Sequence, residues 1–171
     1  MNRKLAGNIA RFVVLALAQV FVFNKIQTTG YISPQVYVLF ILMLPFEISG
    51  FWLLFWGFTM GLSVDYLMHT PGMHAAAAVT LAFLRPGVIR LVGKKDDEEP
   101  WQYPNVRDSG TMWFLAYTLI LVFLHHLMLF YLEVFRFSEF FFTLLKVLVN
   151  TVLTTLIIML LQFLFFSRRP D

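Results

Sequence analysis

Residues 51–82 read FWLLFWGFTMGLSVDYLMHTPGMHAAAAVTLA, two apolar stretches separated by a Pro-Gly pair. The first stretch, and the second once it is continued to about residue 92, approach the roughly 20 apolar residues that a helix needs to cross the hydrocarbon core of a bilayer. Pro71-Gly72 between them is typical of a tight turn, so the two helices would run antiparallel and side by side. This stretch therefore predicts a transmembrane helical hairpin.

The composition of the whole chain indicates the same class of protein. Of its 171 residues, 59% are hydrophobic and only 13% are charged, whereas a soluble globular domain has about 25% charged residues. A soluble domain of this size buries only about 70% of the surface that its unfolded chain exposes, so it could not hide this much Phe, Leu and Val from water. We therefore exclude a water-soluble domain. The chain contains no cysteine, which excludes disulfides and thiolate metal sites.

Six apolar stretches predict six transmembrane helices in a single membrane domain that covers residues 1–171. The second helix is short and reaches membrane length only if Pro34 occupies its first turn, where the missing N–H costs nothing. In the fourth helix, Arg85-Pro86 leaves two possibilities: the span ends at Leu84, or it continues and Arg85 snorkels to the interface. We place the helices at approximately 6–23, 32–46, 51–68, 73–92, 111–132 and 144–166, with a polar cytoplasmic loop at 93–110.

Basic residues indicate the topology, because the cytoplasmic flanks of membrane helices collect Lys and Arg. With six helices, both termini and the 93–110 loop share one side of the membrane. With five helices, the basic residues at the two termini would lie on opposite sides of the membrane. We therefore predict an all-α integral membrane protein with six transmembrane helices and with both termini in the cytoplasm. Ten of the 13 basic residues then lie on that side: Arg3, Lys4, Arg11, Arg85, Arg90, Lys94, Lys95, Arg107, Arg168 and Arg169.

Small residues mark the faces on which helices are expected to pack. Gly57 and Gly61 form a G-x-x-x-G on the third predicted helix, and Asp65 continues the same face. Ala78 and Ala82 repeat at the same interval on the fourth helix. Because helices in lipid associate by close packing, these two faces predict a tight contact within the chain, with a contact to another protein as the alternative.

Four histidines gather with Asp65 at the outer level of the predicted bundle. We expect Asp65 to cap the turn that follows its helix. A metal site could combine Asp65 and His69 with a histidine of the fifth helix. Two observations disfavour a metal site. His125 and His126 are adjacent, and adjacent residues on a helix point about 100° apart, so both cannot face one ion without strain. The sequence also contains no H-E-x-x-H. We predict no metal and no cofactor, and we keep a ligand cluster as a lesser possibility at His69, His74, His125 and His126.

A polar stripe runs along the last predicted helix, where Lys146, Asn150 and Thr154 repeat every four residues. Polar side chains that face lipid are disfavoured. The stripe must therefore face another helix, a partner or a wet cavity. Lys146 lies at the outer end near Glu133 and Glu139, so an ion pair is expected there.

The sequence lacks the motifs of common catalytic sites. It contains no G-x-S-x-G, no Ser-x-x-Lys and no G-x-x-x-x-G-K, each of which would supply a nucleophile or a phosphate cradle. We therefore do not expect this protein to be an enzyme, and we predict no catalytic residues. We expect contact with membrane lipid and none with nucleic acid.

Several motifs follow one another in the middle of the chain: Tyr31-Ile32-Ser33-Pro34, an apolar helix that ends at Pro45, Gly57 to Gly61 with Asp65, and Pro71-Gly72-Met73-His74-Ala75. With these motifs the sequence resembles the MreD family of rod shape-determining membrane proteins. The resemblance covers most of the chain and is carried mainly by residues 31–82. The histidine pair at 125–126 with a short basic C-terminus is similar to the members of this family from Bacteroidota.

The resemblance implies a non-enzymatic scaffold of the cell-elongation complex in the bacterial inner membrane. Members of this family bind MreC and, with it, the glycosyltransferase RodA and its class B penicillin-binding transpeptidase, and so support peptidoglycan synthesis and cell shape. The scaffold would use Gly57, Gly61, Asp65, Ala78, Ala82, Asn150 and Thr154 for helix packing or partner contact.

The same resemblance leaves an alternative open, because the MreD fold is similar to that of the substrate-binding S components of ECF-type uptake transporters. Such a subunit would bind a vitamin or a metal ion at the outer histidines, and it would meet its coupling partner through Ala6 and Ala10. A small-solute channel is a further possibility, but only the last predicted helix carries a polar stripe.

Overall fold

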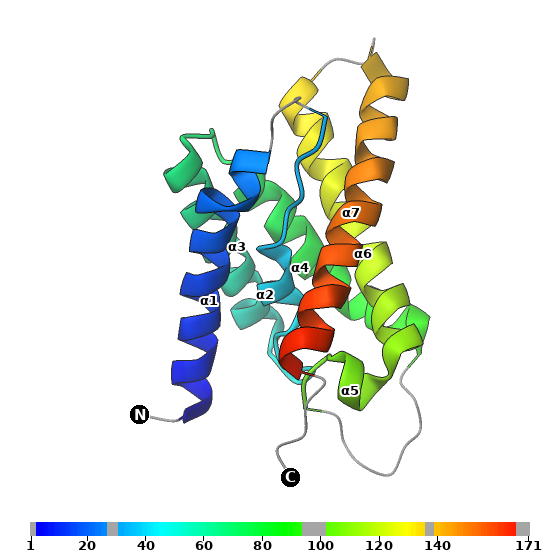
Figure 1. Cartoon of the computed structure of the whole chain (residues 1–171). Helices are drawn as coiled ribbons and strands as arrows, with labels where there is room; N and C mark the ends of the chain where they lie inside the picture. The colour runs from blue at the N-terminus through cyan, green and yellow to red at the C-terminus, as the bar shows by residue number, and fades with distance from the viewer. Residues whose placement is uncertain (1–2, 27–30, 94–101, 136–138, 167–171) are drawn as a thin grey trace.

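The computed structural model describes residues 3–26, 31–93, 102–135 and 139–166, and helices dominate it (Figure 1). The described residues form no strand. The elements are α1 (Arg3–Phe21), the 3-10 turn η1 (Phe23–Ile26), α2 (Val38–Leu42), α3 (Gly50–Met68), α4 (Met73–Val92), α5 (Val106–Ser109), α6 (Thr111–Val134) and α7 (Phe140–Phe166).

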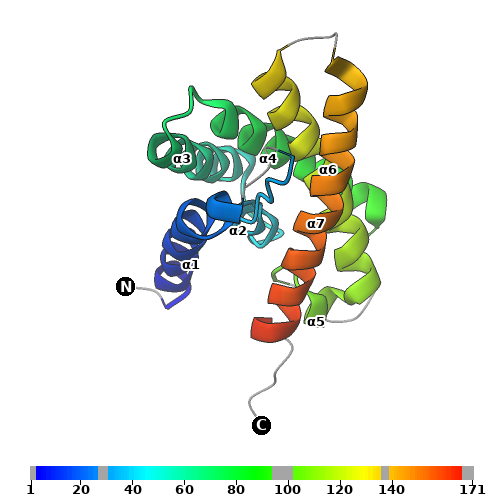
Figure 2. The ribbon, with the colours of Figure 1, turned by 45° about the horizontal axis from the view of Figure 1, so that its top comes forward.

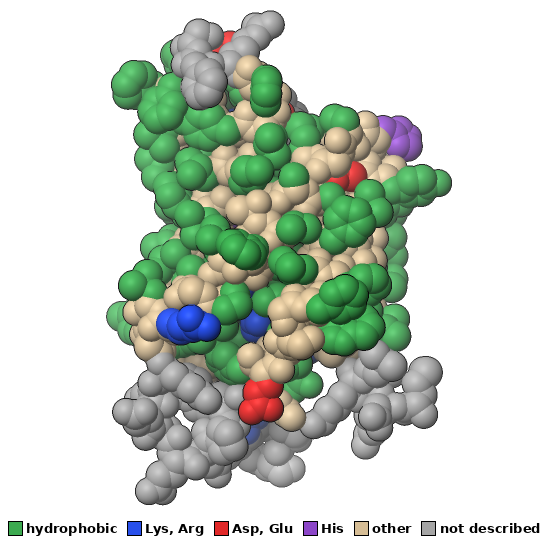
Figure 3. Space-filling view, turned by 180° about the vertical axis from the view of Figure 1, so that it is seen from behind, with side chains coloured by type: hydrophobic (Ala, Val, Ile, Leu, Met, Phe, Trp, Pro, Cys, Tyr) green, Lys and Arg blue, Asp and Glu red, His purple; other side chains and the backbone are tan. Residues whose placement is uncertain are grey.

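Five helices of the described chain are long and apolar enough to cross a membrane. Seen from behind, hydrophobic side chains cover most of the molecular surface, and charged side chains are few (Figure 3). Such a surface is stable against hydrocarbon and not against water. The chain is therefore a multi-pass membrane protein, with candidate spans at Gly7–Lys25, Gly50–Met68, Met73–Val92, Thr111–Val134 and Phe140–Phe165.

The predicted helix at 32–46 is wrong in its extent, because only the five residues of α2 are α-helical there. Pro34 has no N–H and pushes the residue before it away from helical geometry. The chain instead descends between α1 and α7 as a non-helical stretch before α2 begins (Figures 1 and 2). We call residues 31–37 the central segment. Residues 36–44 are each at most 4% exposed, so this part of the chain forms the middle of the core.

The beginning of α1 and the end of α7 lie at the same end of the molecule (Figure 1). The placement of both termini in the cytoplasm stays a prediction. We call this end the terminal end and the opposite one, which carries the α3–α4 turn, the distal end. Within the predicted loop at 93–110, residues 94–101 lie outside the described chain, and α5 is a single turn that the sequence did not predict.

The hairpin of α3 and α4 packs closely at its glycines. A Cβ atom added to Gly61 would lie 2.5 Å from the Cα atom of Ala75, and one added to Gly57 would lie 2.9 Å from the Cβ atom of Ala82. Ala78 contributes the carbonyl oxygen 3.2 Å from the same position at Gly57. Because these residues are small, the backbones of α3 and α4 can lie this close together. A larger side chain at either glycine would require one of the helices to shift.

Arg85 is buried rather than snorkelling, and α4 continues past Pro86 to Val92. The Arg85 guanidinium donates to the carbonyl oxygens of Leu44 and Pro45, and its Nε donates to the Tyr117 hydroxyl at 2.8 Å. Those carbonyls follow the end of α2 and have no helical N–H partner. Because these acceptors lie within reach of α4, the guanidinium is satisfied inside the protein. The predicted continuation of the helix past Pro86 is therefore confirmed, whereas the predicted snorkelling of Arg85 is wrong.

We predict that Gly61→Ala destabilises the protein strongly, because its methyl group would press on the backbone of α4 at Ala75. Overpacking of this kind costs about 1–3 kcal/mol. Gly87→Ala is the matched control, since nothing lies within 4 Å of a Cβ atom at that helical position. The measurement is the melting temperature of the detergent-purified variants. Equal melting temperatures for both variants and the wild type would refute the close packing.

Candidate functional site

The central segment obtains its backbone hydrogen bonds from side chains rather than from a helix or a sheet. Gln19 of α1 is 1% exposed and reaches across to it. Its Oε1 accepts from the N–H groups of Val36 and Tyr37 at 2.7 and 3.3 Å, and its Nε2 donates to the Pro34 carbonyl at 3.1 Å. One glutamine therefore satisfies three backbone groups that lipid could not.

The polar stripe of α7 holds the central segment from the other side. Asn150 donates to the Tyr31 carbonyl at 2.7 Å and accepts from the Ser33 N–H at 2.5 Å, and Thr154 accepts from the Gln35 N–H at 3.1 Å. The spacing of Asn150 and Thr154 along α7 matches the spacing of Ser33 and Gln35 along the central segment. Four residues of helix rise about 6 Å, and two residues of extended chain advance about 6.6 Å.

The stripe faces the interior as predicted. Asn150 and Thr154 bind the backbone of the central segment, and the stripe also meets α6, where Thr154 Oγ1 lies 3.3 Å from His126 Nε2 and Lys146 pairs with Glu133.

At the distal end, Asp65 joins α3 to the start of α4. Its Oδ1 accepts from the Thr70 hydroxyl at 2.5 Å and from the His74 N–H at 3.1 Å, and its Oδ2 accepts from the Ala75 N–H at 2.8 Å. These N–H groups belong to the first turn of α4, which has no helical acceptor for them. Asp65 therefore caps the turn, as predicted from the sequence.

The four histidines do not form a single cluster. His125 Nε2 lies 2.7 Å from the Tyr37 hydroxyl, whereas His126 Nδ1 lies 2.7 Å from the Val122 carbonyl oxygen. The two ring planes are inclined by 80°, and the ring nitrogens of the two residues have different partners. His69 is exposed, and its Nδ1 lies near a carbonyl of its own helix. In the part of the chain that the structure describes, no three His, Asp or Glu side chains come close enough to hold a metal ion.

Only His74 of these four lines a polar cavity at the distal end. The cavity has a volume of about 170 Å³, which is room for about six water molecules at roughly 30 Å³ each. We call it the distal cavity. Its walls come from the central segment, the α3–α4 turn and α6, and are formed by Ser33, Gln35, Met68, Thr70, Met73, His74, Leu129, Phe130 and Glu133.

Hydrogen-bond acceptors on the walls of the distal cavity remain available to a ligand. The Gln35 side chain is buried, and its Oε1 has no partner within the described chain. Its Nε2 already donates to Ser33, and the Thr70 hydroxyl already donates to Asp65. The Glu133 carboxylate accepts from Lys146 at 2.9 Å, the ion pair that the sequence predicts. A ligand of this cavity would therefore be small and would carry hydrogen-bond donors or positive charge.

Sequence reasoning missed several buried polar residues that organise this region. Gln19, Gln35 and Tyr37 shape the central segment and the cavity, and Tyr117 supports Arg85. The available signal was the polar side chain itself, since an amide such as that of Gln19 within an apolar span requires an internal partner. The identity of that partner depends on residues far away in the sequence.

Comparisons with known proteins add no further assignment, since no family model, curated protein or solved structure matches this chain.

We predict that Asn150→Leu loosens the central segment, because it removes the partners of the Ser33 N–H and the Tyr31 carbonyl. A buried backbone group left without a partner costs about 1–3 kcal/mol. Hydrogen exchange followed by mass spectrometry should show faster exchange in the peptide that covers residues 31–37. Val149→Leu on the exposed side of α7 is the control. Unchanged protection in Asn150→Leu would contradict the proposed role of the stripe.

Proposed function

We propose that this protein is a non-enzymatic scaffold of the bacterial cell-elongation complex, located in the inner membrane and resembling MreD. In this role it binds the single transmembrane helix of MreC and, with it, holds RodA and a class B penicillin-binding transpeptidase in one arrangement. The observation that carries the proposal is an apolar groove on the membrane-facing surface, which offers a seat for a partner helix.

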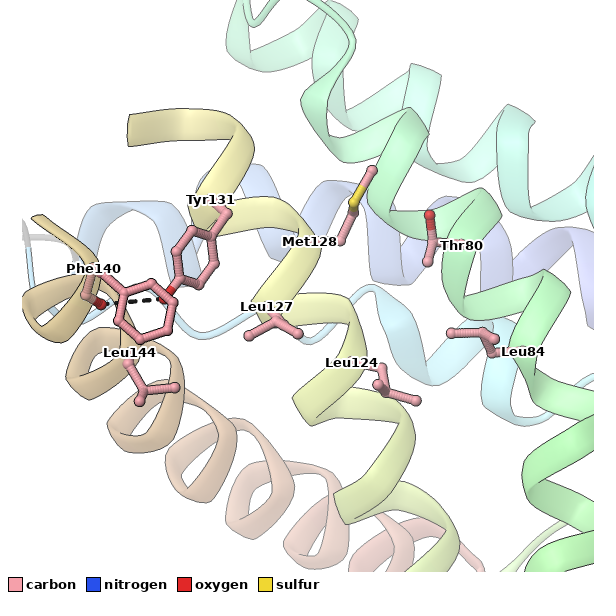
Figure 4. Close-up of a pocket in the computed structure, with 8 residues that line it drawn as sticks. All are labelled: Thr80, Leu84, Leu124, Leu127, Met128, Tyr131, Phe140 and Leu144. Atoms are coloured by element: carbon pink, nitrogen blue, oxygen red, sulfur yellow. Dashed lines mark hydrogen bonds between the residues drawn. The ribbon is translucent and has the colours of Figure 1, made fainter. Parts of the chain in front are cut away.

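The groove lies between α4, α6 and the first turns of α7 (Figure 4). Its volume is about 610 Å³. Side chains of α4 and α6 project toward one another across it, and Tyr131 and Phe140 close one end (Figure 4). We call it the α4–α6 groove. It is lined by Thr80, Leu84, Leu124, Leu127, Met128, Tyr131, Phe140 and Leu144.

The few polar groups of the α4–α6 groove are already satisfied within the protein. The Tyr131 hydroxyl donates to the Phe140 carbonyl at 3.1 Å, as Figure 4 shows, and the Thr80 hydroxyl donates to the Ala76 carbonyl at 2.9 Å. The groove therefore presents an apolar surface to its surroundings. An apolar helix can pack into it by van der Waals contact, which is the main source of helix association in lipid.

The polar residues of the core also support a structural role. Gln19, Asn150 and Thr154 are used to hold the central segment, Asp65 to cap α4, and Arg85 to hold the end of α2. Each of these side chains contributes to one rigid arrangement of helices. A rigid body with an apolar recess is what a membrane scaffold requires.

The natural absence of cysteine makes site-directed cross-linking a direct test. We predict that Leu127→Cys in the α4–α6 groove forms a cross-link to a cysteine in the transmembrane helix of co-expressed MreC. Phe58→Cys, which is exposed on α3, should not do so. The measurement is the yield of cross-linked product in native membranes. Equal yields from both positions, or a product from Phe58→Cys alone, would contradict the proposal.

A substrate-binding subunit of an ECF-type transporter is the second candidate function, and the distal cavity is the observation that favours it. Under the scaffold proposal, we predict that the purified protein carries neither a vitamin nor a metal ion in stoichiometric amount. Mass spectrometry of small molecules and elemental analysis measure this. A stoichiometric ligand that is lost in Glu133→Gln, which alters a wall of the cavity, would favour the transporter over the scaffold.

A further inference from the structure

The distal cavity is small compared with most vitamins. Its volume of about 170 Å³ leaves room for a molecule of up to about six non-hydrogen atoms, if each takes the space of a water molecule. In the part of the chain that the structure describes, no group of His, Asp and Glu side chains can hold a metal ion there. The cavity therefore suits a ligand of another class, and its walls indicate which one.

The walls of the distal cavity are partly polar and partly apolar. Polar side chains come from the central segment, the α3–α4 turn, the first turn of α4 and the end of α6: Ser33, Gln35, Thr70, His74 and Glu133. Apolar side chains complete the walls: Met68, Met73, Leu129 and Phe130. A ligand that fills such a cavity has a polar group and a short apolar part.

The polar groups of the walls act mainly as hydrogen-bond acceptors. Gln35 is 1% exposed, its Nε2 donates to Ser33 Oγ at 2.9 Å, and its Oε1 has no partner within the described residues. The Thr70 hydroxyl donates to Asp65. His74 Nδ1 lies 3.0 Å from Asp65 Oδ1, so a neutral ring that donates there presents Nε2 as an acceptor. A buried acceptor without a partner costs free energy, and a ligand that carries N–H donors removes this cost.

The charges beside the distal cavity favour a cation. Asp65 is already bound by the α3–α4 turn and by the first turn of α4. Glu133 lines the cavity, and Lys146 donates to one of its oxygens at 2.9 Å. A carboxylate accepts from several donors, so Glu133 can bind a further one. Two carboxylates and one ammonium group leave an excess of one negative charge when the His74 ring is neutral.

The distal cavity is within reach of water. The Glu133 side chain is 42% exposed, and α6 ends at the next residue, Val134. The end of α6 and the α3–α4 turn lie at the same end of the molecule (Figure 1). A ligand dissolved on that side of the membrane can therefore reach the cavity without crossing the apolar surface.

We propose that the distal cavity binds a small primary alkylammonium ion. Its ammonium group supplies one positive charge and three N–H donors for acceptors such as Gln35 Oε1 and the Glu133 carboxylate, and its alkyl group contacts Met73 and Leu129. A sodium ion would match the charge but would leave the apolar walls without a contact. The proposal is independent of the scaffold function, which concerns the α4–α6 groove, and it implies no transport.

Thermal unfolding of the detergent-purified full chain tests the proposal. Propylammonium chloride is titrated at neutral pH and constant ionic strength, and a ligand of the folded state raises the melting temperature with saturation. We predict a saturable rise in the millimolar range, because so few atoms make contact. Propan-1-ol has the same number of non-hydrogen atoms but no charge, sodium chloride has no alkyl group, and tetraethylammonium chloride is too large and has no N–H. None of these three should produce the rise.

Variants of the walls give opposite expected effects. Glu133→Gln, which removes a charge, and Gln35→Met, which removes an acceptor, should each weaken the binding about tenfold, or about 1.4 kcal/mol. Lys146→Met should strengthen the binding, because it frees the Glu133 oxygen that Lys146 occupies. Glu139→Gln is the matched control, since Glu139 is exposed and does not line the cavity.

The opposite effects at Glu133 and Lys146 separate ligand binding from a general loss of stability, because removing either partner breaks the same ion pair. The melting temperature of each variant without ligand shows that it is folded. Equal stabilisation by propan-1-ol or by sodium chloride would overturn the proposal. Wild-type binding in Glu133→Gln, or weaker binding in Lys146→Met, would do the same, whatever the cross-linking of the α4–α6 groove shows.

Discussion

A polypeptide that leaves helical geometry inside a membrane must find every backbone hydrogen bond within the protein, because hydrocarbon offers none. The central segment meets this requirement through Gln19 on one side and through Asn150 and Thr154 on the other. Because these side chains come from α1 and α7, the same bonds join the first and the last described helices to the core. The distal cavity depends on this arrangement, because Ser33 and Gln35 of the central segment form part of its wall.

Arg85 completes the arrangement at the other end of the same stretch. Its guanidinium binds the carbonyl oxygens that follow α2, and Tyr117 donates to the Leu42 carbonyl at 3.0 Å. A short helix of five residues would be marginal by itself. Here its end is fixed by a cation from α4 and a phenol from α6, so the irregular part of the chain is held at both ends.

The sequence alone predicts an all-helical membrane protein, a tight α3–α4 hairpin, the cap by Asp65 and the ion pair of Lys146 with Glu133. Each of these depends on residues close in the chain or on a repeat along one helix. The central segment could not be predicted in the same way. Pro34 disfavours a helix at the residue before it, but a short apolar run is otherwise compatible with a helix. The distant side chains of Gln19 and Asn150, which stabilise the extended form, cannot be identified from the local sequence. Arg85 was misjudged for the same reason, because its acceptors lie about 40 residues away.

The contacts of α7 have a consequence for how the protein is made. This helix is synthesised after all the other described helices, yet Asn150 and Thr154 supply hydrogen bonds to residues 31–35. Until α7 is inserted, the Ser33 and Gln35 N–H groups and the Tyr31 carbonyl lack these partners, whereas the groups bound by Gln19 can already be satisfied. The hydrogen bonds of the central segment can therefore be complete only after the last helix has been made.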